Sequence, residues 1–157
     1  MKKQKGFSLI ELLIVVAIIL IIAAIAIPNL LRSRMAANEA SAVGSIRTLN
    51  TSAVTYSSTY PGAGYPASLI AMGGANPCTA LSTNACLIDA VLAGGTKSGY
   101  TFTWTGDGAT PSVGYSIVAI PVSVGTSGQR SFFSDQSGVI RYQATGAAAK
   151  VTDPPLQ

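Results

Sequence analysis

The chain has 157 residues, of which 48% are hydrophobic and only 10% are charged. This balance is too apolar for a disordered protein, and the length allows one folded domain beside a terminal segment. Histidine is absent, which removes the commonest general base and the commonest metal ligand at once. Three of the ten basic residues lie ahead of Gly6, so the other seven nearly balance six acidic residues and predict no surface for nucleic acid.

The N-terminal segment is a short basic leader followed by a long apolar run. Three lysines precede sixteen consecutive apolar residues at positions 12–27. As a helix, residues 7–27 would be about 31 Å long, which matches the hydrocarbon core of a bilayer. The lysines favour an N-terminus in the cytoplasm, with everything after Pro28 outside it.

Two ordinary interpretations of this segment leave one residue unexplained. It could be a secretory signal peptide cleaved after Ala24-Ile25-Ala26, or an uncleaved membrane anchor. Neither accounts for Glu11, a single carboxylate directly before the apolar run. Because an unpaired charge in hydrocarbon is costly, an intramembrane carboxylate is a functional candidate that needs a counter-charge.

The stretch KGFSLIELLIVVAIILIIAAIAIP, residues 5–28, resembles the N-terminal signal of type IV prepilins and pseudopilins. The shared features are the basic leader, Gly6, Phe7, Ser8, Glu11 as the fifth residue after Gly6, the apolar helix and Pro28. The resemblance implies that a prepilin peptidase removes residues 1–6 by cutting between Gly6 and Phe7 and that the new amine of Phe7 is N-methylated. It also implies that the chain's partners are copies of itself in a helical filament and an inner-membrane assembly platform, with no cofactor.

Cleavage would supply the counter-charge that Glu11 needs. The amine of Phe7 is positive and stays positive after methylation, and opposite charges attract strongly in a low-dielectric core. By the resemblance, Glu11 meets the amine of a neighbouring subunit and sets the register of assembly. The alternative is that Glu11 bonds the amine of its own Phe7, one helical turn away.

The long helix is expected to continue beyond the membrane. Pro28 lacks a backbone donor and should kink the helix without ending it. Residues 29–60 are expected to form an amphipathic helix, because apolar residues recur with spacings of three and four: Ala42, Ile46, Leu49, Ala53, Tyr56 and Tyr60. Arg32, Arg34 and Glu39 precede this stripe and are expected to form a polar collar just outside the bilayer. The two arginines are expected either to face lipid headgroups or to form salt bridges between subunits.

The next segment, residues 61–99, is expected to be a loop with a short helix. The turn-forming sequence of residues 61–66 ends the long helix, and apolar residues at 87, 88, 91 and 92 predict an amphipathic helix closed by Gly94 and Gly95. Cys78 and Cys86 enclose seven residues. An exported location is oxidising, which favours a disulfide between them, with two free thiols as the alternative.

Four strands are expected in residues 100–143. They are residues 100–105, 114–120, 130–134 and 139–143, and the short loops between them favour an antiparallel meander. The tail, residues 144–157, is expected to be poorly ordered, with Pro154 and Pro155 barring a strand. The predicted fold class is therefore α+β: a long N-terminal helix, with a membrane-spanning half at 7–28, packed on an antiparallel sheet of about four strands.

Nothing in the sequence forms a catalytic or metal-binding set. No two of the six acidic residues are close in sequence, and two thiols without histidine make a poor metal site. Asp107 and Asp135 are the nearest candidates for calcium, but their loops lack a regular series of oxygen ligands. The sequence therefore favours a non-enzymatic subunit of a type IV pilus or pilus-like filament, held in the inner membrane before it reaches the surface. The alternatives are a pseudopilin of a type II secretion system, in a periplasmic pseudopilus, or a membrane-anchored exported binding domain.

Overall fold

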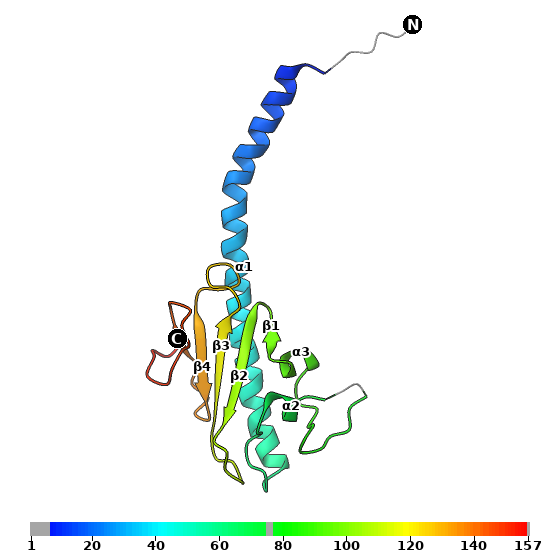
Figure 1. Ribbon diagram of the computed structural model, residues 1–157, viewed down its shortest axis with the longest axis vertical. Helices are drawn as coiled ribbons and strands as arrows, with labels where there is room; N and C mark the ends of the chain where they lie inside the picture. Colours follow the sequence, from blue (N-terminus) through cyan, green and yellow to red (C-terminus); the bar gives the residue numbers. More distant parts are fainter. Residues whose placement is uncertain (1–6, 75–76, 157) are drawn as a thin grey trace. The chain divides into compact units, whose positions relative to one another are not determined.

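The computed structural model describes residues 7–74 and 77–156 (Figure 1). The chain divides into two compact units, Met1–Arg34 and Met35–Gln157, each considered by itself. Helix α1, Leu9–Thr59, contributes to both units. Pro28 lies inside this helix and does not end it, because the ring removes one backbone donor while its neighbours keep theirs. The kink at Pro28 stays a prediction.

In the second unit, α1 contributes the apolar stripe that the sequence predicted. Ala42, Ile46, Leu49 and Ala53 are fully buried, and Tyr56 is 3% exposed. Figure 1 shows this part of α1 lying behind the sheet. Side chains across the interface share one core, and the amide of Asn50 bonds the hydroxyls of both Ser134 and Tyr115, at 2.9 and 3.1 Å. The amphipathic pattern therefore buries one face of the helix against the sheet.

The sheet is a five-stranded antiparallel meander in the order β1-β2-β3-β4-β5. Its strands are β1 Thr96–Lys97, β2 Tyr100–Gly106, β3 Tyr115–Pro121, β4 Ser131–Asp135 and β5 Arg141–Gln143. Burial alternates along β3, so that Tyr115, Ile117 and Ala119 face the core. The predicted α+β class and antiparallel meander are confirmed. The structure adds β1, which at two residues is too short to show a periodicity in sequence.

In chain order, two single-turn helices come between α1 and the sheet. They are α2, Leu69–Met72, and α3, Ala90–Ala93, capped by the side chains of Ser68 and Asp89. The helix expected to include residues 87 and 88 is shorter than predicted. Backbone N–H groups of Leu87 and Ile88 donate to the carbonyl of Met72, which holds this segment against α2 outside the helix.

The C-terminal segment was expected to be poorly ordered, but its described residues, 144–156, are held by hydrogen bonds to the rest of the chain. The N–H of Leu156 donates to the carbonyl of Ile140 at 2.7 Å, and the N–H of Tyr142 donates to Pro154 at 3.1 Å. Ala149 is 3% exposed. Residues 144–156 thus pack against β5 through contacts that local sequence patterns do not reveal. The two prolines still limit regular pairing, because this segment adds only an isolated bridge between Arg141 and Pro155.

Glu39 links α1 to the loop between β3 and β4. One carboxylate oxygen accepts from the backbone N–H groups of Gln129 and Arg130 at 2.9 and 3.0 Å, and the other from Nε of Arg130 at 2.8 Å. Glu39 is 8% exposed, so it is enclosed by its own chain and is not part of an exposed polar collar. The Arg130 guanidinium also lies 5.7 Å from the ring centroids of Phe132 and Tyr142.

This arrangement lowers the pKa of Glu39 below its ordinary value of 4.5. Burial by itself raises the pKa, but the hydrogen bonds from Gln129 and Arg130 and the charge of Arg130 outweigh it. A depressed folded pKa means that the carboxylate stabilises the fold fully above the unfolded pKa. The contribution is lost as the pH falls through the folded pKa.

We therefore expect Glu39→Ala to lower the free energy of unfolding by about 1–3 kcal/mol at neutral pH, since it leaves two backbone donors and a guanidinium without their acceptor. Urea unfolding of the full chain in detergent measures this change. Glu39→Gln keeps the shape of the side chain but removes its charge. Below pH 4.5 the free energy of unfolding of this variant should therefore fall less steeply with pH than that of the wild type. An unchanged pH dependence in Glu39→Gln would contradict this role.

Candidate functional site

The candidate site is the start of α1, where the basic leader meets the apolar segment. Gly6, the predicted residue before the cleaved bond, lies outside the described residues. Phe7, on the other side of that bond, precedes α1 and is 82% exposed. Within the described chain, nothing therefore covers the Phe7 side chain beside the predicted processing site.

Glu11 lies in the first turn of α1 and bonds to its own chain. Its Oε2 accepts from the backbone N–H of Ser8 at 3.0 Å, and the carbonyl of Ser8 accepts the helical bond from Leu12 at 3.2 Å. Ser8 is thus the last residue before the helix, and Glu11, three residues later, reaches back to its N–H as in one half of a capping box. Among the described residues, this is the only hydrogen bond that the carboxylate accepts.

The sequence carries a signal for this contact that the predictions for Glu11 did not use. Ser-x-x-Glu ahead of an apolar run is the pattern of a capping box. The negative carboxylate also lies at the helix N-terminus, where the helix dipole favours it. Because one oxygen is used by Ser8, the carboxylate keeps Oε1 for a further donor such as an amine.

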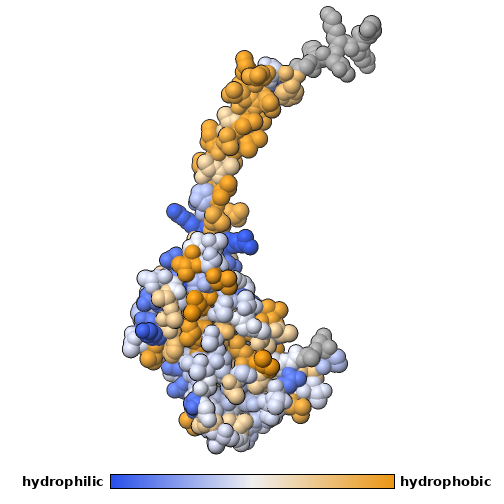
Figure 2. Space-filling view, viewed as in Figure 1, coloured by the Kyte–Doolittle hydropathy of each residue, from blue (hydrophilic) through white to orange (hydrophobic). Residues whose placement is uncertain are grey.

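The apolar segment that follows has no cover within its own unit. Its large side chains are between 46% and 77% exposed from Leu9 to Ile27. Figure 2 shows a predominantly hydrophobic surface along the face of this segment that is in view. Such a surface in water would be strongly unfavourable. By length and composition this part of α1 can cross a membrane, so it is a candidate transmembrane helix.

The predicted disulfide between Cys78 and Cys86 is confirmed, and the alternative of two free thiols is wrong. The two Cα atoms are 6.1 Å apart, and both residues are exposed. The loop that the disulfide closes holds the end of α1, because the hydroxyl of Tyr56 donates to the carbonyl of Ser82 at 2.5 Å. The disulfide thus constrains a loop that packs on the long helix.

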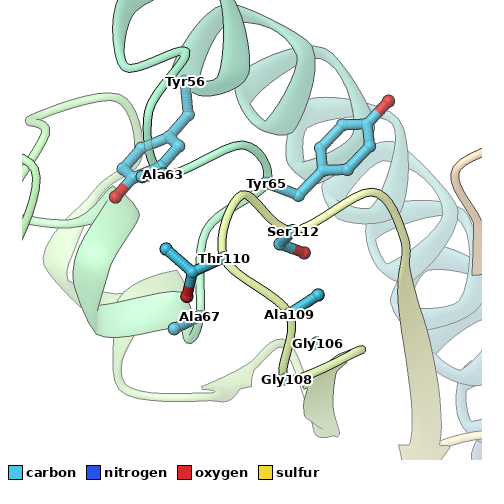
Figure 3. A pocket seen from close by; sticks show the side chains of 9 residues that line it. All are labelled: Tyr56, Ala63, Tyr65, Ala67, Gly106, Gly108, Ala109, Thr110 and Ser112. Carbon is cyan, nitrogen blue, oxygen red and sulfur yellow. The ribbon is translucent and has the colours of Figure 1, made fainter.

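A cavity of about 320 Å³ lies between the end of α1 and the loop that joins β2 to β3 (Figure 3). Most of its lining is small: Ala63, Ala67, Gly106, Gly108, Ala109, Thr110 and Ser112, with Tyr56 and Tyr65 beside them. In Figure 3 the hydroxyl of Tyr65 points away from the other labelled residues. No carboxylate, amine or thiol lines this cavity, so it offers no acid and base pair for catalysis.

The two acids considered for calcium are used to shape loops. Asp107 accepts from the N–H groups of Ala109, Val113 and Gly114 at 2.8–3.1 Å. Its pKa is lowered first by a hydrogen bond from the Ser112 side chain and then by these backbone donors. Asp135 accepts from the N–H of Ser137 at 2.9 Å in the turn before β5. Within residues 7–74 and 77–156, no three acidic, cysteine or histidine side chains gather around a point that could hold a metal ion.

Comparison with known proteins confirms the resemblance at the N-terminus. Residues 1–27 match a family model described as the prokaryotic N-terminal methylation motif. A stretch of 39 residues is 64% identical to the type IV wide pilus major component PilA4 of Thermus thermophilus. This match covers 25% of the present chain and 30% of that relative, so the chain spans less than a third of the relative's length. No solved structure matches the chain.

We expect removal of the disulfide to loosen the loop at the end of α1. Cys78→Ser with Cys86→Ser should lower the free energy of unfolding by about 2–3 kcal/mol, because the unfolded chain regains the freedom of the closed loop. Urea unfolding of the full chain in detergent provides the measurement. Wild-type protein treated with reductant should lose a similar amount, and reductant should leave the double variant unaffected. Equal stability of the oxidised and reduced wild type would argue against this role.

Proposed function

We propose that the chain is a structural, non-enzymatic subunit of a type IV pilus or a pilus-like filament. The match of residues 1–27 to the N-terminal methylation motif carries this proposal. The exposed apolar side chains of the same segment support it, because they need a bilayer or other helices around them. A relative with part of this sequence is named as the major component of a pilus.

The proposed precursor is a single-pass protein of the inner membrane with its N-terminus in the cytoplasm. A prepilin peptidase cleaves between Gly6 and Phe7 and N-methylates the amine of Phe7. A residue without a Cβ before the bond suits close approach by a protease backbone. The second unit, which carries the disulfide, then lies in an oxidising compartment outside the cytoplasm.

Glu11 is proposed to set the register of assembly. In the precursor its carboxylate caps its own helix through Ser8. Cleavage creates a positive amine at Phe7, and the free oxygen of a neighbouring Glu11 can accept from it. A charge that remains unpaired in an apolar surrounding is costly, so axial positions that pair amine and carboxylate are favoured over those that do not. The competing possibility is that Glu11 pairs with the amine of its own chain.

The membrane serves as the reservoir from which copies enter the filament through an inner-membrane assembly platform. Moving α1 from lipid to a bundle of like helices changes its apolar burial little. Register must therefore come from close packing and from the Glu11 pair, which differ between one axial position and another. A filament forms when this head-to-tail contact repeats without closing into a ring.

The resemblance at the N-terminus is shared by pseudopilins of type II secretion systems, so a pseudopilin is the alternative function. The relative from Thermus thermophilus favours the pilus, because that protein is a pilus component. Electron microscopy of sheared surface filaments, with mass spectrometry of their subunits, tests the proposal directly. Filaments that contain this chain and begin at methylated Phe7 would support it, whereas absence of the chain from surface filaments would overturn the pilus assignment.

The proposed cleavage between Gly6 and Phe7 can be tested by substituting Gly6. We expect Gly6→Val to block cleavage, because the added side chain prevents close approach of the peptidase. Intact-mass spectrometry of the membrane fraction should then find the chain with residues 1–6 still attached and with no methyl group on Phe7. Gly44→Ala, at an exposed glycine within α1, is the matched control and should be processed normally. A normal mature mass for Gly6→Val would refute cleavage at this bond.

The proposed role of Glu11 in setting the register of assembly can be tested by substitution. We expect Glu11→Leu to be inserted and processed but to lower the yield of sheared filaments by about tenfold or more, since loss of a charge pair is worth more than 1.4 kcal/mol in an apolar core. Immunoblotting of membrane and sheared fractions measures both steps. Glu11→Gln separates assembly from helix capping, because its amide oxygen can still accept from the N–H of Ser8 while the negative charge is gone, so its filament yield should fall as in Glu11→Leu. Wild-type filament yield from Glu11→Leu would show that the carboxylate does not set the register.

A further inference from the structure

A groove of about 330 Å³ lies in the second unit between α1 and the end of the chain. One side is a face of α1 that includes Ala40, Val43 and Arg47, and the other side is formed by Arg130 and Leu156. Val43 and Leu156 are half-buried against the core, so they give the groove an apolar part. We call this feature the arginine groove, because it places two guanidinium groups beside an apolar surface.

The guanidinium of Arg130 is held in place from one side only. Its Nε donates to Oε2 of Glu39 at 2.8 Å, and its central carbon lies 5.7 Å from the ring centroids of Phe132 and Tyr142. Among the described residues, the two terminal nitrogens of Arg130 make no hydrogen bond. A guanidinium that is oriented in this way and keeps its terminal donors free is pre-organised for an acceptor.

Arg47 supplies the second free guanidinium. The residue is exposed, and within residues 7–74 and 77–156 only its backbone carbonyl is engaged, by the hydroxyl of Thr51 at 3.0 Å. Glu39 also lines the groove, but both of its oxygens already accept hydrogen bonds. Two arginines and one glutamate give the lining a net charge of +1. The groove therefore favours an anion, and its free donors come from two different elements of the fold.

We propose that the arginine groove binds a phosphate group that carries an apolar substituent. A phosphate presents several oxygens in a tetrahedral arrangement, so guanidinium groups from two elements can bind it at once, whereas one guanidinium fork already matches a carboxylate. The substituent would lie against Val43 and Leu156, where burial of its carbon atoms adds to the affinity. A soluble phosphate monoester and the headgroup of an anionic lipid both have this chemistry. The inference goes beyond the proposed function, because it requires neither a filament nor a second copy.

Calorimetric titration of the full chain in a non-ionic detergent tests the groove with butyl phosphate and with inorganic phosphate. We expect saturable binding of butyl phosphate, with a Kd several-fold lower than that of inorganic phosphate because of the apolar lining. Arg47→Gln should raise the Kd of butyl phosphate by about tenfold or more, since it removes a charged donor. Arg47 is exposed, so this variant keeps the fold.

Lys150→Gln is the matched control, because it removes one positive charge from an exposed residue outside the groove. It should bind butyl phosphate like the wild type. Val43→Thr nearly keeps the shape of the side chain but makes it polar, so it should weaken butyl phosphate and leave inorganic phosphate unchanged. Equal affinities for the wild type and Arg47→Gln, or equal losses in Arg47→Gln and Lys150→Gln, would overturn the groove as the binding site.

Micelles that contain phosphatidylglycerol, compared with micelles that contain phosphatidylcholine, distinguish the two sources of phosphate. Binding that requires phosphatidylglycerol and is lost in Arg47→Gln would support the groove with a lipid as its ligand. Binding of butyl phosphate that phosphatidylglycerol does not compete away would support the groove with a soluble monoester. Absence of saturable binding by the wild type in every arm would overturn the proposal.

Discussion

One constraint governs this molecule: a single helix must satisfy two different surroundings. The side chains of α1 in the first unit are apolar and exposed, so they need hydrocarbon or other helices around them. In the second unit the same helix buries a stripe, which includes Ile46 and Leu49, against a sheet. The sequence meets both demands by changing from a fully apolar composition before Pro28 to an amphipathic one after it. The sheet, the loops and the disulfide all serve to complete the core on that later stripe.

Acidic residues are rare in this chain, and the structure gives each of the two on α1 a defined partner. Glu11 bonds the N–H of Ser8 at the start of the helix, and Glu39 bonds Arg130 and the backbone beside it. Both carboxylates accept backbone donors, which is the least costly way to keep a charge at the edge of an apolar region. The two carboxylates differ in whether both of their oxygens accept hydrogen bonds within the described residues. Glu39 is enclosed by its own chain, whereas Glu11 retains an oxygen in an exposed position, which suits it to a second partner.

Local patterns predicted most of this fold, and distant contacts account for what they missed. The stripe from Ala42 to Tyr56 and the four longer strands follow from periodicity, which is a property of neighbouring residues. The bond from Glu39 to Arg130 joins residues 91 positions apart, and no spacing rule reports such a pair. The shortened α3 has a similar cause, because Leu87 and Ile88 bond to Met72 rather than to a helix. At the candidate site the residue types were readable, and the Ser-x-x-Glu spacing also carried a signal for the bond between Ser8 and Glu11.

The C-terminal segment has a consequence for the outer edge of the sheet at β5. An open sheet edge offers unpaired backbone groups to the same edge of another molecule, and such pairing leads to aggregation. Here the carbonyl of Ile140 and the N–H of Tyr142, which bracket the start of β5, are occupied by residues 154–156. Pro154 and Pro155 have no N–H of their own, so the covering segment is a poor template for a further strand. The end of the chain thus covers the β5 edge of the sheet and keeps that edge from pairing with the sheet of another molecule.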